Sequence, residues 1–128
     1  MVLLIDTDPQ ANLTTCMNYY DVNESISIVM EQTMIGVDVN LEKVILHHNE
    51  SVDLIQSSLD LATTESSIYN TLEIKNIKKS IKDIKDKYDY ILIDCMPSLG
   101  LLAINAFSCS DIVIIPVQTQ FLTAKNLE

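Results

Sequence analysis

Residues 2–12 read VLLIDTDPQAN, a run of branched apolar residues that ends in two aspartates and two amides. The apolar residues 2–5 predict a strand buried on both faces, as is typical of parallel sheets. Ligands of such sheets bind outside the carboxyl ends of the strands, and Asp6 and Asp8 lie at that end. Acids in this position commonly handle a metal ion or a water molecule beside a phosphate.

The same pattern returns twice in the second half of the chain. The segments YILIDCMPSLG and IVIIPVQTQ, at residues 90–100 and 112–120, again place polar residues after an apolar run. We predict further strands at residues 52–55, 90–93 and 112–117. Helices are expected at residues 25–33, 41–47, 59–69, 72–87 and 99–108, with a short one ending near 16–20 and another starting at 121. Apolar strands that alternate with helices indicate an α/β fold, with a mostly parallel sheet, helices on both faces and one domain over residues 1–128.

The clearest helical pattern covers residues 72–87. Its apolar residues recur at intervals of three and four, at Ile74, Ile77, Ile81, Ile84 and Tyr88. Six lysines fall between residues 75 and 87 on the opposite face, at positions 75, 78, 79, 82, 85 and 87. We interpret this cluster as a solvated helix face, with a weak nucleic-acid patch as the less favoured alternative.

The amino-acid composition and charge of the chain exclude some classes of function. The 128 residues carry a net charge of −10, and all eight basic residues are lysines. An acidic chain without arginine disfavours tight binding to a phosphate backbone, and it offers no arginine finger. No apolar run approaches the roughly 18 to 20 residues of a membrane span, and no signal-peptide pattern is present. With three cysteines lacking metal-site spacing, a reduced cytoplasmic protein with no membrane partner is expected.

Asp94 closes the apolar run ILID, which is the pattern of a Walker B acid that orders Mg²⁺ beside nucleotide phosphates. Alone the pattern is weak, because an aspartate there also caps a following helix. A second strand ending in acids, and a third ending in Pro-Val-Gln, favour the active-site interpretation. Acids converging from two strand ends would repel each other unless a cation lay between them.

These three ordered motifs resemble those of the ParA/Soj partition ATPases, which are deviant-Walker P-loop NTPases of the SIMIBI class related to MinD and the nitrogenase iron protein. The segment VDLIQSSLDLA, at residues 52–62, also has the look of this family, so the resemblance covers almost the whole chain. It implies an ATPase that uses ATP and magnesium to segregate plasmids or chromosomes. A ParB-type partner, nonspecific DNA and a cytoplasmic, nucleoid-associated location are implied in the same way.

The resemblance also implies roles for individual residues. Asp94 corresponds to the Walker B aspartate and would hold Mg²⁺ through water, with Asp6 assisting the same metal. Asp8 would be the catalytic carboxylate that positions the attacking water. The residues expected to contact or sense the nucleotide are Gln10, Asn12, Pro97, Ser98 and Pro116. Met96 stands where the family usually has the first proline of Pro-Pro-Ser, so the second switch loop has one fixed φ angle fewer than in the family.

One family motif is not found in the sequence, namely the lysine- and glycine-rich Walker A loop that grips the phosphates. The chain has two glycines, Gly36 before Val37 and Gly100 before Leu101, and neither stands in such a context. We therefore expect a central piece of a partition ATPase, without the Walker A segment and the C-terminal part, that is inactive alone and binds no nucleotide. In the family's strand order the missing strand lies between residues 90–94 and 112–117. These two would then stay apart or pair directly, and such open edges favour homo-oligomers.

Two alternatives remain open. The chain could be a non-catalytic, self-associating α/β module or remnant. It could also be a flavodoxin-like or response-regulator-like domain, since these folds place acids at strand ends too. The latter is disfavoured because those folds begin with a strand before the acidic cluster and do not need the DPQAN segment.

Overall fold

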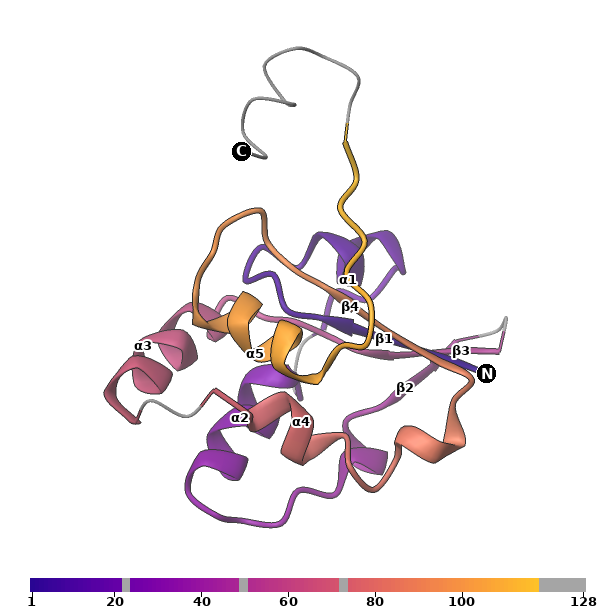
Figure 1. Cartoon of the computed structure of the whole chain (residues 1–128). Coiled ribbons are helices and arrows are strands. Elements are labelled where there is room, and N and C mark those ends of the chain that lie inside the picture. Colours follow the sequence, from indigo (N-terminus) through magenta and orange to yellow (C-terminus); the bar gives the residue numbers. More distant parts are fainter. Residues whose placement is uncertain (22–23, 49–50, 72–73, 118–128) are drawn as a thin grey trace.

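The computed structural model describes residues 1–21, 24–48, 51–71 and 74–117, which form a four-stranded sheet with strand order β2-β3-β1-β4 (Figure 1). The strands are β1 Val2–Asp6, β2 Leu46–His48, β3 Val52–Ile55 and β4 Tyr90–Asp94. Strand β1 pairs in parallel with both β3 and β4, whereas β2 runs antiparallel to β3. The sheet is therefore mixed but mostly parallel, which confirms the expected α/β class.

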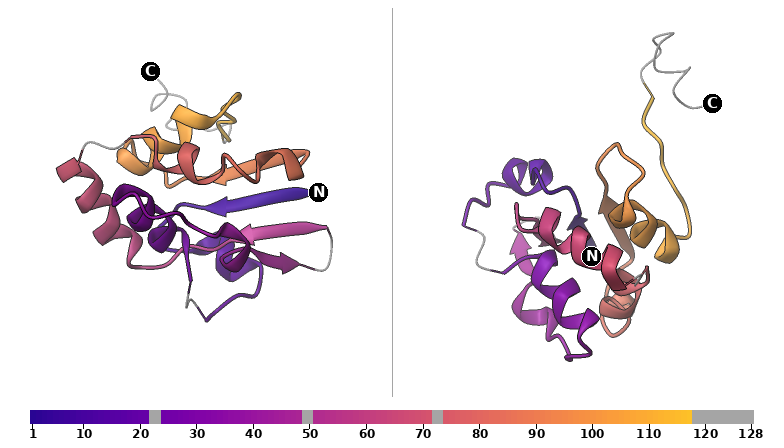
Figure 2. Two further views of the ribbon diagram at one scale, coloured as in Figure 1. Left: turned by 90° about the horizontal axis from the view of Figure 1, so that it is seen from below. Right: turned by 90° about the vertical axis from the view of Figure 1, so that its left-hand side faces the viewer.

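Five helices accompany these strands in the described residues: α1 Asn12–Cys16, α2 Ile26–Met34, α3 Leu61–Thr71, α4 Asn76–Ser80 and α5 Leu101–Cys109. Helix α4 packs against α2 and α5, and α3 packs against the same two helices. These four helices gather on one side of the sheet, while α1 lies on the other side near the carboxyl end of β1 (Figures 1 and 2). None of the helices described is long and apolar enough to cross a membrane.

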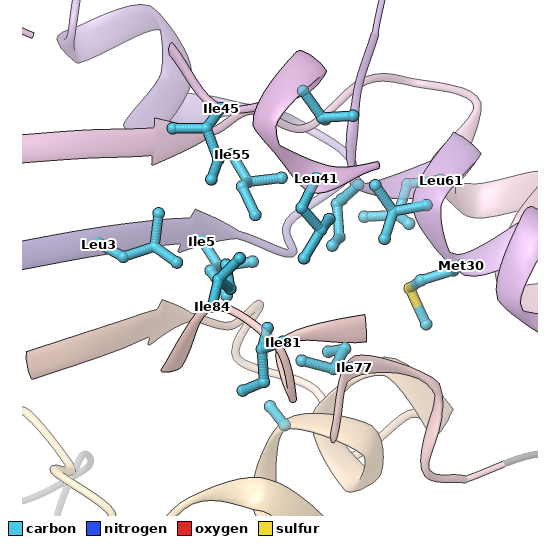
Figure 3. Packing of buried hydrophobic residues seen from close by; sticks show 14 of the residues in the cluster. Leu3, Ile5, Met30, Leu41, Ile45, Ile55, Leu61, Ile77, Ile81 and Ile84 are labelled. Carbon is cyan, nitrogen blue, oxygen red and sulfur yellow. The ribbon is translucent and has the colours of Figure 1, made fainter. Parts of the chain in front are cut away.

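The core lies between the sheet and the layer formed by α2–α5 (Figure 3). Leu3 and Ile5 project into it from β1 and Ile55 from β3, and all three are fully buried. Burial of one such side chain contributes roughly 1.5 to 3 kcal/mol, so the alternating residues of β1 and β3 anchor the helix layer. This packing fixes the direction of both strands and hence the position of their carboxyl ends.

The outer strand β4 is only half covered, which corrects the prediction of a strand buried on both faces. Ile91 and Ile93 pack against the core, but Tyr90 and Leu92 on the other face are 69% and 49% exposed. The reason is that α2–α5 lie on the face that carries Ile91 and Ile93, whereas the opposite face of β4 is open to solvent (Figure 2).

The prediction of a buried strand at residues 112–117 is wrong. This segment has no regular structure, and its apolar side chains are exposed to solvent. Figure 1 shows it running away from the sheet after α5. A strand requires a neighbour for its backbone N–H and C=O groups, and within the described chain this segment has none. Of the two arrangements expected for residues 90–94 and 112–117, the structure has them apart.

The helix expected at residues 41–47 is also wrong. A single 3₁₀ turn at Leu41–Lys43 is followed by strand β2, which forms a hairpin with β3. Within this hairpin, His47 Nδ1 lies 2.8 Å from Oδ1 of Asp53, which is 3% exposed, and the Tyr88 hydroxyl donates to its Oδ2 at 2.6 Å. Burial, together with this hydrogen bond to Asp53, raises the pKa of Tyr88 well above its usual value of 10.0. The two contacts satisfy a carboxylate that would otherwise be buried without partners.

The expected helix at 72–87 is broken. Helix α4 covers residues 76–80 and is followed by turns and a 3₁₀ turn at Lys85–Lys87. The amide of Ile84 donates to Ile81 O at 3.1 Å, a bond to the third preceding residue that tightens the chain. The apolar pattern itself is confirmed at Ile77, Ile81 and Ile84, which are buried, whereas Ile74 is 40% exposed. Residues 72–73, and the helix expected from residue 121, lie outside the described residues.

Candidate functional site

The acids of the first and last strands meet at one edge of the sheet. Asp6 and Asp94 are directly opposite each other in the parallel pairing of β1 with β4. Thr7 fixes this register, because its N–H and its Oγ1 donate to Asp94 O at 2.9 and 2.6 Å. Both carboxylates therefore leave the sheet at the edge where ligands of parallel sheets bind.

Asp6 is fully buried and organises the loop that follows β1. Its Oδ2 accepts hydrogen bonds from the N–H and the hydroxyl of Thr14, at 2.9 and 2.6 Å. Its Oδ1 accepts the N–H of Asp8 at 3.0 Å. A carboxylate can accept about four hydrogen bonds, so most of its capacity is used by the protein. The metal-assisting role of Asp6 stays a prediction, while its role in holding residues 8–14 on the sheet is plain.

Asp8 lies partly exposed in that loop. Its Oδ1 accepts the N–H of Gln10 at 2.9 Å, and its carbonyl oxygen accepts the N–H of Ala11 and the hydroxyl of Ser57 at 2.8 and 2.7 Å. Ser57 is the second residue after β3, and its own N–H donates to Thr14 Oγ1 at 3.1 Å. The loop is thus tied to the carboxyl ends of both β1 and β3, and Asp8 is held beside Asp6.

Asp94 is the acid most available to a ligand, since its side chain is exposed. Partial burial raises its pKa above the usual value, and the charges of Asp6 and Asp8 raise it further. Three acids within electrostatic reach of one another form a region where a bound cation is stabilised.

The other predicted site residues lie on exposed segments of the chain. Gln10 and Asn12 are exposed on the loop, and Pro97 and Ser98 are exposed in the segment between β4 and α5. Pro116 lies in the exposed segment 112–117, outside the sheet. Residues 118–120 of the third motif lie outside the described residues.

Three residues that hold the site together were not predicted from the sequence: Thr7, Thr14 and Ser57. A signal in the sequence existed only for Ser57, which lies two residues after the predicted strand 52–55, near the edge where Asp6 and Asp94 lie. Thr14 reaches Asp6 across eight residues, a spacing that no local pattern marks.

Ala11 adopts a left-handed backbone conformation, with φ 53° and ψ 40°, at the start of α1. A side chain in this region costs roughly 1–2 kcal/mol relative to the ordinary regions, and glycine avoids that cost. We expect Ala11→Gly to raise the free energy of unfolding by about 0.5–1 kcal/mol. Urea denaturation measures this change. The matched control is Ala62→Gly in the exposed face of α3, which should destabilise by a similar amount. Equal losses in both variants would contradict the strain at Ala11.

The acids at this edge offer the type of ligand that a magnesium ion takes, but no group of three or more acidic, histidine or cysteine side chains in the described residues is arranged to hold a metal ion, and no site for a triphosphate is found there either. Carboxylate oxygens around Asp94 are the ligands that Mg²⁺ prefers. A phosphate needs backbone N–H groups at an open helix N-terminus. Gly100 stands at such a position, because it is the N-cap of α5. The Glu65 carboxylate, however, lies at this start of α5, accepts the N–H of Leu102 at 3.3 Å, and occupies the space where a Cβ of residue 100 would point. Gly36, with φ 74°, lies in the turn after α2. No phosphate cradle is therefore found in the described residues.

Comparisons with known proteins place this arrangement in a family. The family model AAA_31, described as an AAA domain, matches residues 1–128. The sporulation initiation inhibitor protein Soj of Bacillus subtilis is 35% identical over 98% of this chain and 49% of its own length. The chromosome-partitioning ATPase Soj of Treponema pallidum is 32% identical over 98% of this chain and 48% of its own length.

Solved structures share the fold. A plasmid partition protein from Borrelia burgdorferi superposes with a TM-score of 0.82 and 31% identity, over 98% of this chain and 56% of that one. Cobyrinic acid a,c-diamide synthase from Mycobacterium smegmatis, with a bound ATP analogue and magnesium, has a TM-score of 0.82 and 27% identity over 98% of this chain and 52% of that one. The chain spans about half the length of the curated relatives it matches. A family match over all 128 residues, together with these relatives and the shared fold, shows that the chain belongs to the ParA/Soj-like ATPase family.

Proposed function

We propose that this chain is the central part of a magnesium- and ATP-dependent partition ATPase, which segregates plasmids or chromosomes. The observation that carries the proposal is the meeting of Asp6, Asp8 and Asp94 at one edge of the sheet, where burial and then the charges of Asp6 and Asp8 raise the pKa of Asp94. Relatives whose names give a partition function support it. A ParB-type partner, nonspecific DNA and a nucleoid-associated, cytoplasmic location belong to this proposal.

In this proposal Asp94, whose side chain is exposed, would hold the magnesium ion, and Asp6 would assist. When bound, the magnesium ion supplies neutralisation of phosphate charge. Asp8 would position or polarise the attacking water in the complete protein, with its Oδ1 and its carbonyl oxygen held by the loop. In the complete protein, Gln10, Asn12, Pro97, Ser98 and Pro116 would contact or sense the nucleotide.

The phosphate grip would have to come from outside these 128 residues. The described residues contain no cradle for a triphosphate, so we derive no hydrolysis step from this chain. We propose instead that the chain alone neither binds ATP tightly nor hydrolyses it, and contributes the acidic half of a complete site.

Isothermal titration of ATP with Mg²⁺ into the 128-residue chain tests this proposal. We expect no saturable binding at concentrations of about 1 to 100 µM. The partition protein from Borrelia burgdorferi whose structure holds AMPPNP serves as a control under the same conditions. Saturable micromolar binding by this chain would contradict the proposal that it lacks a phosphate site.

A further inference from the structure

The segment between β4 and α5 is held at both of its ends. At its beginning, the N–H and the hydroxyl of Thr7 donate to Asp94 O at 2.9 and 2.6 Å. At its end, Oε1 of Glu65 on α3 accepts the N–H of Leu102 at 3.3 Å, in the first turn of α5. Figure 1 shows residues 95–100 running between these two attachments, from the end of β4 to the start of α5 beside α3. Both attachments come from other elements, because Thr7 follows β1 and Glu65 lies on α3.

Gly100 and the Glu65 carboxylate fit each other closely. The Cβ of an alanine at position 100 would overlap with Oε1 of Glu65 and would lie 3.4 Å from its Cδ, so a side chain there displaces the carboxylate. The backbone gives no other reason for a glycine, because φ −101° and ψ −179° are extended values that any residue adopts. The lack of a side chain at Gly100 therefore serves to admit the carboxylate.

A carboxylate is also well suited to the amino end of a helix. The N–H groups in the first turn of a helix have no acceptor within the helix, and the helix dipole stabilises a negative charge beside them. Gly100, the N-cap residue of α5, has no side-chain oxygen that could accept these N–H groups. Glu65 supplies from α3 the cap that the N-cap residue of α5 cannot provide.

We infer that Glu65 is a positioning residue, which holds the segment 95–99 in place through the start of α5. The N–H of Gly100 donates to Ser98 O at 3.0 Å, so a shift of residue 100 moves the hydrogen-bonded Ser98 with it. The segment contains Pro97 and Ser98, which would contact or sense the nucleotide in the complete protein. The inference rests on the proposed function only for these two roles, whereas the positioning itself is a property of the described chain.

Hydrogen exchange of the Leu102 amide in the 128-residue chain, without nucleotide, tests the contact. Glu65→Ala removes the acceptor and is expected to speed this exchange at least about tenfold, because a hydrogen bond to a charged group is lost. Glu65→Gln retains an acceptor oxygen and should speed it by no more than about threefold. The matched control is Asp83→Ala, which removes an exposed negative charge from the turns after α4 and should leave this exchange unchanged.

Gly100→Ala is the second variant, and it reaches the same contact without removing the carboxylate. We expect it to speed the exchange of the Leu102 amide as Glu65→Ala does. The double variant should exchange no faster than either single variant, because the same hydrogen bond can be lost only once. Thermal denaturation checks that every variant folds, and Gly100→Ala alone decides the test if Glu65→Ala does not fold.

NMR spectra of the same variants distinguish positioning from a contact that only stabilises the fold. The amide signals of residues 95–99 should shift or broaden in Glu65→Ala and in Gly100→Ala, and should stay in place in Glu65→Gln and Asp83→Ala. The inference is overturned if Leu102 exchange is unchanged in Glu65→Ala or Gly100→Ala, or if the two effects add in the double variant. It is also overturned if that exchange speeds up while the signals of residues 95–99 stay in place.

Discussion

Replacing Asp6 with alanine is expected to lower the free energy of unfolding by about 3 kcal/mol. The fully buried carboxylate accepts the Thr14 N–H, the Thr14 hydroxyl and the Asp8 N–H, and alanine leaves these donors without an acceptor. The lost hydrogen bonds mainly affect the loop at residues 8–14, because the Asp6 carboxylate attaches this loop to β1. We therefore expect local loss of order around Asp8 in addition to global destabilisation.

Urea denaturation measures the global effect, and hydrogen exchange of the Asp8 and Thr14 amides measures the local one. The matched control is Asp94→Ala, because Asp94 is the register partner of Asp6 but is exposed and should change stability by no more than about 0.5 kcal/mol. Asp6→Asn keeps one carbonyl acceptor and should fall between the two. If Asp6→Ala and Asp94→Ala had equally small effects, Asp6 would not be needed to hold the loop.

The sequence predicts the sheet well where burial decides the structure. The apolar runs at residues 2–5 and 52–55 form β1 and β3, and both supply buried core residues. The meeting of Asp6 with Asp94 was also predictable, since parallel strands end at the same edge. Helices α3 and α5 lie where they were expected, within two residues at each end.

The parts of the fold that the sequence did not predict depend on contacts between residues that are distant in the sequence. Residues 112–117 have the composition of a strand, but composition cannot supply the neighbour that a strand requires, and in the described chain that neighbour is absent. Strand β2 depends on its pairing with β3 and on the contact of His47 with the buried Asp53, neither of which a helical period reveals. The structural role of Asp6 depends on Thr14, which reaches it only after the loop has folded.

Replacing Asp94 with asparagine is expected to have the opposite effect from the change at Asp6. The folded protein without metal should become more stable by about 0.5 kcal/mol, because one charge is removed from an acidic cluster that is screened by solvent. At the same time, stabilisation by Mg²⁺ should disappear. In the unmodified chain we expect about 0.5–1 kcal/mol of stabilisation by about 10 mM MgCl₂, beyond that given by KCl of equal ionic strength.

The pH dependence follows from the direction of the pKa shift. The pKa of Asp94 is raised above its usual 3.8 by burial and by Asp6 and Asp8, so the folded protein binds a proton at Asp94 more readily than the unfolded chain does. Ionised Asp94 therefore costs stability at neutral pH, and this cost is lost as the pH falls through the raised pKa. The stability advantage of Asp94→Asn should be largest near neutral pH and should shrink as the solution is acidified toward the usual carboxyl range.

Thermal denaturation of both proteins, with and without MgCl₂ and over a range of pH, measures all three effects. The matched control is Asp38→Asn, at an exposed aspartate after α2, which should leave the magnesium response unchanged. If the magnesium response survived in Asp94→Asn but was lost in Asp38→Asn, the metal would bind near Asp38 and not at the edge of the sheet. Loss of the response in Asp94→Asn alone would tie the cation to the carboxyl end of β4, where Asp6 and Asp8 already raise the affinity of that edge for positive charge.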